Sequence, residues 1–139
     1  MTKKLFSFVA ILLGFTIITF AQTTAPTPTT PSISLKELIT KDWKYIGFEE
    51  FGVLKPADSI VEKYDKISFT SDGLYTLIKK DVTSAGKWTL NETTRQLYCT
   101  DGVTGKQIMY TVKKCNTTIL KLSYQSPDLS STIYNYTVK

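Results

Sequence analysis

The sequence has no histidine and only two cysteines among its 139 residues. Without an imidazole it cannot form a Ser-His-Asp or Cys-His nucleophilic system, and it has no histidine ligand for a metal ion. Two thiols are too few for a four-thiolate zinc site. These absences exclude several classes of hydrolase and zinc protein, and we expect the protein to hold no metal and no cofactor.

The first segment, residues 1–21, has the pattern of a secretory signal peptide. Lys3 and Lys4 precede an uncharged apolar run from Leu5 to Phe20, and small residues lie at its end, at Thr19 and Ala21. The run has about 16 residues, fewer than the roughly 20 needed to span a bilayer. The alternative is an uncleaved membrane anchor. We expect export to the periplasm or the medium, with no membrane span after cleavage.

The next segment, residues 22–33 (QTTAPTPTTPSI), is rich in threonine and proline and predicts an extended tether. Cleavage before it would remove Lys3 and Lys4. That leaves 15 basic residues against 12 acidic ones, so the net charge falls from +5 to +3. Nucleic-acid-binding domains carry clustered basic residues, whereas these lysines are scattered. We therefore expect no nucleic-acid partner.

The remaining segment, residues 34–139, predicts one short helix followed only by strands. Ser34 and Glu37 have the spacing of a capping box, which indicates a helix over 35–40. Period-two patterns and turn signals then indicate eight short strands. In the first strand, Trp43, Tyr45 and Gly47 share one face, and Ile67 and Phe69 mark the second strand. The other six strands are expected over 74–79, 86–90, 96–100, 107–113, 119–125 and 132–138.

This strand count predicts an all-β domain of antiparallel strands joined in sequence order. No long helix is available for parallel crossovers, and we expect every proline to lie outside the strands. Eight such strands can close into an up-and-down barrel of the lipocalin-like kind, which removes exposed edges. A two-sheet β-sandwich is the alternative. We expect a monomer.

Residues 51–65 (FGVLKPADSIVEKYD) form an unusually long connection between the first two strands. Connections of this length often carry function or cover a site. Two interpretations stay open: a lid over one barrel mouth, or an ordinary surface loop with a partial helical turn.

Three motifs together resemble the bacterial exported lipocalin-like domain family over residues 35–139. They are the first strand KDWKYIGF, then Phe69-x-x-Asp72-Gly73-x-Tyr75, and then Gly86-Lys87-Trp88-x-Leu90. The resemblance implies an eight-stranded barrel and binding of a small apolar molecule. Lipocalins proper carry Gly-x-Trp on the first strand, whereas this chain has Lys41-Asp42-Trp43.

Many of the residues expected to face the barrel interior are large and aromatic. Rings with a few hydroxyl groups suit an amphipathic small molecule. The candidate ligand-binding residues are Trp43, Tyr45, Phe69, Tyr75, Trp88, Tyr110 and Tyr134. Side chains can also simply fill an eight-stranded barrel. Two hypotheses follow: a non-catalytic binding protein for a small apolar or amphipathic ligand, or a solid-cored structural module that contacts an envelope protein. A cavity of about 300 Å³ or more would favour the first.

The two cysteines, Cys99 and Cys115, are predicted to stay unpaired although export favours disulfides. A turn at 101–106 places Cys99 opposite Ile108. Cys115 is then seven residues further along, which is about 23 Å in a strand. A disulfide needs Cα atoms within about 7 Å.

Acidic residues give little support for catalysis, and we expect the protein not to be an enzyme. Glu49 and Glu50 are adjacent, so in a strand they point to opposite faces. A small hydrolase or isomerase would need Glu49, Glu50 or Asp58 to converge with Tyr75.

Overall fold

The structure is a computed structural model that describes residues 32–57 and 62–139. The predicted signal peptide, most of the predicted tether and Asp58 lie outside the described residues. Among the described residues, no helix has both the length and the apolar character needed to cross a membrane.

The described residues form one short α-helix, one 3₁₀ helix and nine strands. These elements are α1 (Leu35–Ile39), β1 (Asp42–Glu50), β2 (Val53–Pro56), η1 (Glu62–Tyr64), β3 (Lys66–Phe69), β4 (Leu74–Lys79), β5 (Val82–Asn91), β6 (Gln96–Asp101), β7 (Gln107–Cys115), β8 (Ile119–Gln125) and β9 (Ser131–Val138).

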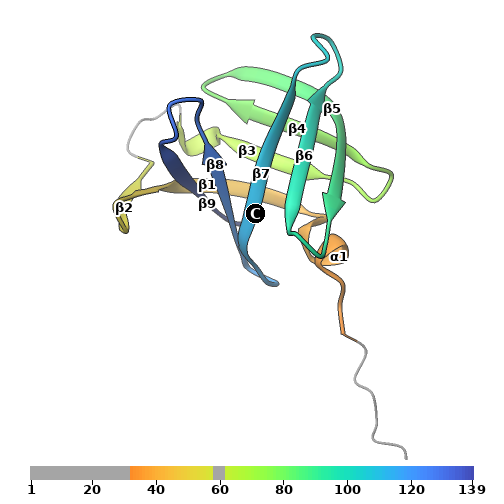
Figure 1. Cartoon of the computed structure of the whole chain (residues 1–139), viewed down its shortest axis with the longest axis horizontal. Helices are drawn as coiled ribbons and strands as arrows, with labels where there is room; N and C mark the ends of the chain where they lie inside the picture. Colours follow the sequence, from red (N-terminus) through yellow and green to blue (C-terminus); the bar gives the residue numbers. More distant parts are fainter. Residues whose placement is uncertain (1–31, 58–61) are drawn as a thin grey trace, which may run out of the picture. The chain divides into compact units, whose positions relative to one another are not determined.

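Eight of the strands form a closed antiparallel barrel (Figure 1). β1 pairs with β3, each strand from β3 to β8 pairs with the next, and β9 pairs back with β1. The predicted eight-stranded up-and-down barrel with a short N-terminal helix is confirmed, and the sandwich is not formed. β2 is additional, because it pairs only with β1 and lies at the margin of the barrel.

The strand boundaries follow the sequence closely except in β5. β4 and β8 have the predicted bounds. β5 begins at Val82 because Lys80 and Asp81 both adopt positive φ angles, 49° and 63°, and make a two-residue hairpin turn. Such turns match the twist of the flanking strands. The strand predicted over 86–90 therefore starts four residues earlier than expected.

The described part of the connection over 51–65 contains a strand, β2, and a 3₁₀ helix, η1, which is the partial helical turn of one interpretation. Phe51 and Gly52 have φ angles of 52° and 79° and turn the chain directly from β1 into β2. Pro56 ends β2, which corrects the prediction that every proline lies outside the strands; an edge strand tolerates proline because it needs fewer N–H donors. Further along, η1 brings the chain back to β3.

A bulge in β1 changes which residues face the interior. Tyr45 pairs with Tyr136, but the register then shifts so that Gly47 pairs with Asn135. Gly47 has a φ of +141°, and a Cβ there would lie 2.2 Å from the Lys55 carbonyl oxygen. Gly47 was expected on the inward face with Tyr45. Instead the shift turns Phe48 inward.

One end of the barrel, here called the helix end, is closed by α1 and filled by apolar side chains (Figure 1). The Ser34 hydroxyl caps α1 by accepting the Glu37 N–H at 3.1 Å. The indole N–H of Trp43 donates to the Ile39 carbonyl at 2.8 Å, which fixes the helix on the core. The ring of Trp88 packs edge-on against Phe69, another member of this core, with centroids 5.3 Å apart.

Candidate functional site

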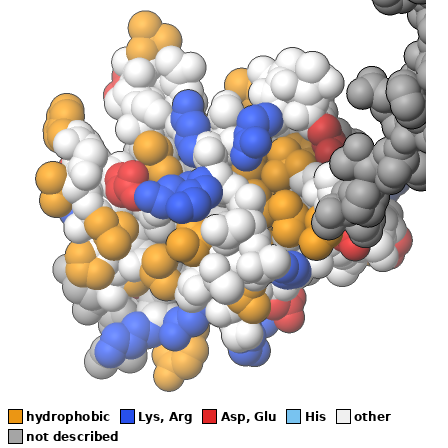
Figure 2. Space-filling model, turned by 90° about the horizontal axis from the view of Figure 1, so that it is seen from below, with side chains coloured by type: hydrophobic (Ala, Val, Ile, Leu, Met, Phe, Trp, Pro, Cys, Tyr) orange, Lys and Arg blue, Asp and Glu red, His pale blue; other side chains and the backbone are white. Residues whose placement is uncertain are grey.

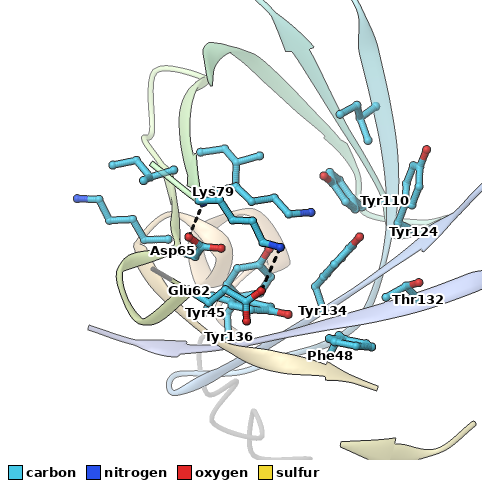
Figure 3. Close-up of a pocket in the computed structure, with 15 residues that line it drawn as sticks. Tyr45, Phe48, Glu62, Asp65, Lys79, Tyr110, Tyr124, Thr132, Tyr134 and Tyr136 are labelled. Carbon is cyan, nitrogen blue, oxygen red and sulfur yellow. Dashed lines mark hydrogen bonds and ion pairs between the residues drawn. The ribbon is translucent and has the colours of Figure 1, made fainter. Parts of the chain in front are cut away.

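The opposite end of the barrel, here called the open end, contains a pocket of about 440 Å³ (Figure 3). It lies where β1 and β4 end and where β7 and β9 begin. Its lining residues are Tyr45, Phe48, Glu62, Asp65, Lys66, Leu77, Ile78, Lys79, Lys80, Ile108, Tyr110, Tyr124, Thr132, Tyr134 and Tyr136.

Strand alternation explains why tyrosines dominate this pocket. Tyr110 on β7 pairs with Tyr124 on β8, so both side chains lie on the same face. Tyr134 and Tyr136 are two residues apart on β9 and share the inward face as well. Because side chains alternate between the two faces of β1, β7, β8 and β9, the inward tyrosine rings of these four strands all line one cavity.

The rings form two packed groups. Tyr45 lies 6.4 Å from Tyr134 and 5.7 Å from Tyr136, measured between ring centroids. The centroids of Tyr110 and Tyr124 are 6.0 Å apart. Tilted and edge-on packing of this kind is favourable for aromatic pairs. The apolar walls are therefore held in place by contacts between the rings themselves.

Three tyrosine hydroxyls of this pocket are held in the protonated form and can act as hydrogen-bond donors. Burial raises the pKa of Tyr110, Tyr134 and Tyr136 above the ordinary value of 10.0. Within the described part of the chain, no hydrogen bond engages the hydroxyl of Tyr110, Tyr124 or Tyr134. These groups are available to a molecule in the pocket.

Charged groups line the β4 side of the pocket. The ammonium of Lys79 lies 5.2 Å from the ring centroid of Tyr134, in cation–π range. The ammonium of Lys80 lies 3.4 Å from a carboxylate oxygen of Glu62. The backbone N–H of Lys80 donates to the buried Asp65 carboxylate at 2.7 Å. In Figure 3, Lys79 approaches from the side opposite Tyr45 and Tyr136. Both lining carboxylates are thus engaged by Lys80.

Comparisons with known proteins support the fold alone. No protein-family model and no curated protein matches the sequence. The structure is similar to the crystal structure of a DUF4847 family protein from Bacteroides vulgatus ATCC 8482. The TM-score is 0.51 at 12% sequence identity, over 72% of this chain and 93% of that one. At this identity the likeness shows a shared architecture.

The structure separates the seven predicted site residues into two groups. Tyr45, Tyr110 and Tyr134 line the pocket. The other four, Trp43, Phe69, Tyr75 and Trp88, are buried in the core and are not part of the pocket lining. Their strands run from the helix end to the open end, and these four positions lie in the half nearer the helix.

Several lining residues were not singled out from the sequence. Phe48 was hidden by the bulge, for which the glycine inside a strand at Gly47 was the available signal. Lys79 follows Tyr75 and Leu77 in strict alternation, so the pattern of β4 places it inward. Tyr124 lies on the same face of β8 as Leu120 and Leu122, so strand alternation is the signal that places it inward.

Cys99 pairs with Ile108 as predicted, and both cysteines are free. A bulge near Lys113 sets Cys115 opposite Leu120, at the far end of β7 from Ile108. Burial raises the pKa of the Cys99 thiol to about 12. The cross-strand partner of Cys99, Ile108, lines the pocket, but Cys99 itself is only 2% exposed. Cys99 therefore lies below the pocket floor.

The acidic residues considered for catalysis are dispersed. Glu49 forms an ion pair with Lys121, and Glu50 forms one with Lys55. Tyr75 lies in the core. Among the described residues, no three Cys, Asp or Glu side chains are grouped closely enough to hold a metal ion.

The surface shows no single basic area on the face seen in Figure 2. Lysine and arginine side chains occur there in several separate places among hydrophobic and polar ones.

Proposed function

We propose that this chain is an exported, non-catalytic binding protein of the lipocalin-like kind, which holds a small amphipathic molecule in the pocket at the open end. The observation that carries this proposal is the pocket of about 440 Å³. Ligand sites have volumes of about 300–1,000 Å³, with mostly apolar walls and a few placed polar groups. A solid-cored module would have no such space inside its barrel.

The chemistry of the lining supports an amphipathic ligand. Phe48, Leu77 and Ile108 provide apolar surface, and the tyrosine rings add more. The hydroxyls of Tyr110 and Tyr134, which bond to no described residue, supply donors that would orient a polar group. A purely apolar molecule would leave these hydroxyls without partners.

A pocket-filling variant tests the proposal with a neutral probe. The fluorescent dye N-phenyl-1-naphthylamine is titrated into the purified protein, and its fluorescence enhancement is measured. We expect saturable binding with one dye per chain, and we expect Ile108→Trp to abolish it by filling the pocket. Val103→Trp is the matched control, because Val103 is 93% exposed on the turn after β6. Absence of binding, or equal binding by Ile108→Trp, would contradict the proposal.

A second candidate function rests on the hairpin formed by β1 and β2. Phe51 at its turn is fully exposed, and Val53 and Leu54 on β2 are also exposed. Exposed apolar groups gathered on one element are typical of protein-contact surfaces. The candidate is an interaction module that contacts a protein of the cell envelope.

Photocrosslinking distinguishes this second candidate from the first. p-Benzoylphenylalanine is placed at Phe51 and, as a control, at Val103, and the protein is irradiated in cells that export it. A partner contact at the hairpin predicts one discrete crosslinked product from position 51 alone. Equal diffuse products from both positions would contradict it.

A further inference from the structure

The lysine on the inner face of β4 is the feature that the fold itself does not require. Tyr75, Leu77 and Lys79 alternate on the inward side, and Lys79 reaches across the mouth to the ring of Tyr134 on β9. Inward lysines often protect an open sheet edge from aggregation. That reason does not apply here, because β4 is paired on both sides, with β3 and β5.

Charge compensation does not explain this lysine either. No carboxylate of the described residues forms an ion pair with Lys79. Of the two acidic residues of the lining, Glu62 forms an ion pair with the Lys80 ammonium, and the Asp65 carboxylate accepts a hydrogen bond from the Lys80 backbone N–H. The described lining carries three lysines and two carboxylates, so a positive charge is left over at the mouth.

The groups next to Lys79 complement an anion. The hydroxyl of Tyr134 has no hydrogen bond to any described residue, and the same holds for the hydroxyls of Tyr110 and Tyr124 in this pocket. A hydroxyl can donate to an oxyanion, and hydrogen bonds to charged groups are shorter and stronger than neutral ones. An ammonium that shares one pocket with several hydroxyl donors therefore fits an oxygen-bearing acid better than an alcohol or an amine.

Resting on the proposed function, we infer that the ligand of this pocket is an anionic amphiphile, whose oxyanion group is held by Lys79 at the mouth and whose apolar body lies among the tyrosines. Carboxylates and phosphate monoesters share this oxyanion chemistry. The ammonium charge attracts either one, while Phe48, Leu77 and Ile108 contact the apolar body.

A matched set of eight-carbon ligands tests the inference. Octanoate, octyl phosphate, octan-1-ol and octylamine share one apolar chain and differ in the head group. Each is used to displace N-phenyl-1-naphthylamine from the full protein at neutral pH and low salt. We expect octanoate or octyl phosphate to displace the dye at about one tenth of the octan-1-ol concentration, and octylamine to be the weakest. A tenfold ratio corresponds to about 1.4 kcal/mol. The stronger of the two anions identifies the head-group class.

Variants assign the preference to Lys79. Lys79→Met should reduce the anion-to-alcohol ratio to within about twofold, whereas Lys79→Arg should keep it. Lys87→Met is the matched control, because Lys87 is exposed on β5, outside this pocket, and its loss changes the net charge equally. Thermal unfolding by circular dichroism establishes that each variant is folded.

The outcomes separate the inference from the proposed function. Dye binding with equal displacement by octanoate and octan-1-ol would overturn the inference and leave the proposed function standing. An unchanged ratio in Lys79→Met would also overturn it. Failure of the neutral dye to bind would overturn the proposed function instead.

Discussion

The helix end and the open end of the barrel are built from the same eight strands but hold different side chains. On β8, Leu120 and Leu122 are fully buried, while Tyr124 further along the same face lines the pocket. On β4 the inward series changes from Tyr75 through Leu77 to Lys79. The inner surface thus becomes more polar toward the open end.

This difference shows how one barrel combines stability with a cavity. The helix end has two tryptophans and the α1 cap, and its large side chains are buried against one another in the core. The open end has rings that line the space without filling it, and hydroxyl and ammonium groups that tolerate water. Stability should therefore depend mainly on the helix end, and binding on the open end.

The largest expected effect is the loss of stability in Trp43→Ala. Trp43 is fully buried, and its indole N–H donates to the Ile39 carbonyl. Removing a buried tryptophan typically costs about 3–5 kcal/mol, because a cavity is left behind. Urea unfolding followed by circular dichroism measures this.

The matching change at the open end is Phe48→Ala, which should cost only about 1 kcal/mol because this ring is partly exposed and borders empty space. Equal losses from Trp43→Ala and Phe48→Ala would show that the two ends contribute alike to stability.

An intermediate effect is expected from enlarging one inward residue at each end of β7. Val112 is 1% exposed in the core, whereas Ile108 lines the pocket. Val112→Phe should lower the free energy of unfolding by about 1–3 kcal/mol through overpacking. Ile108→Phe should change it by less than about 1 kcal/mol, since the pocket accepts the extra atoms. The comparison fails if Ile108→Phe destabilises as much as Val112→Phe.

A smaller effect concerns the buried thiol below the pocket floor. Burial raises the pKa of Cys99 from 9.0 to about 12, so the folded state favours the protonated thiol. Its stabilising contribution is complete below pH 9 and is lost as the pH rises from 9 toward 12. Between these pH values, the free energy of unfolding falls with a slope that approaches about 1.4 kcal/mol per pH unit.

Cys99→Ala should remove the thiol's contribution to the pH dependence of the free energy of unfolding. Urea unfolding of both proteins between pH 8 and pH 10 measures this. Identical slopes in the two proteins would show that the thiol is hydrated in the folded state. It would then be part of the pocket rather than the core.

The fold could be predicted from the sequence because its signals are local. Alternation, turn residues and a capping box fixed the order of the barrel strands, and the boundaries of β4 and β8 were correct. The strand β2 was missed because the long connection contains Pro56, which normally argues against a strand. The early start of β5 was missed because Lys80 and Asp81 are uncommon in a turn that requires positive φ angles.

The pocket was only partly predictable because its position depends on tertiary features. The sequence identified inward aromatic residues, but it could not tell which end of the barrel would be filled. Trp43 and Trp88 were grouped with Tyr45 and Tyr110, although α1 and the apolar strands enclose the tryptophans. The bulge at Gly47, which brings Phe48 into the pocket, depends on a register shift between distant strands.

The most direct test of the account is an NMR titration of methyl-labelled protein with octanoate. Leu77 and Ile108 line the pocket, Leu97 and Leu120 lie in the core, and Leu54 lies on the hairpin. We expect saturable shifts and intermolecular nuclear Overhauser effects at the methyl groups of Leu77 and Ile108, with the core and hairpin methyl groups nearly unchanged. Contacts concentrated at Leu54, or no shift at Leu77 and Ile108, would contradict a ligand site inside the open end.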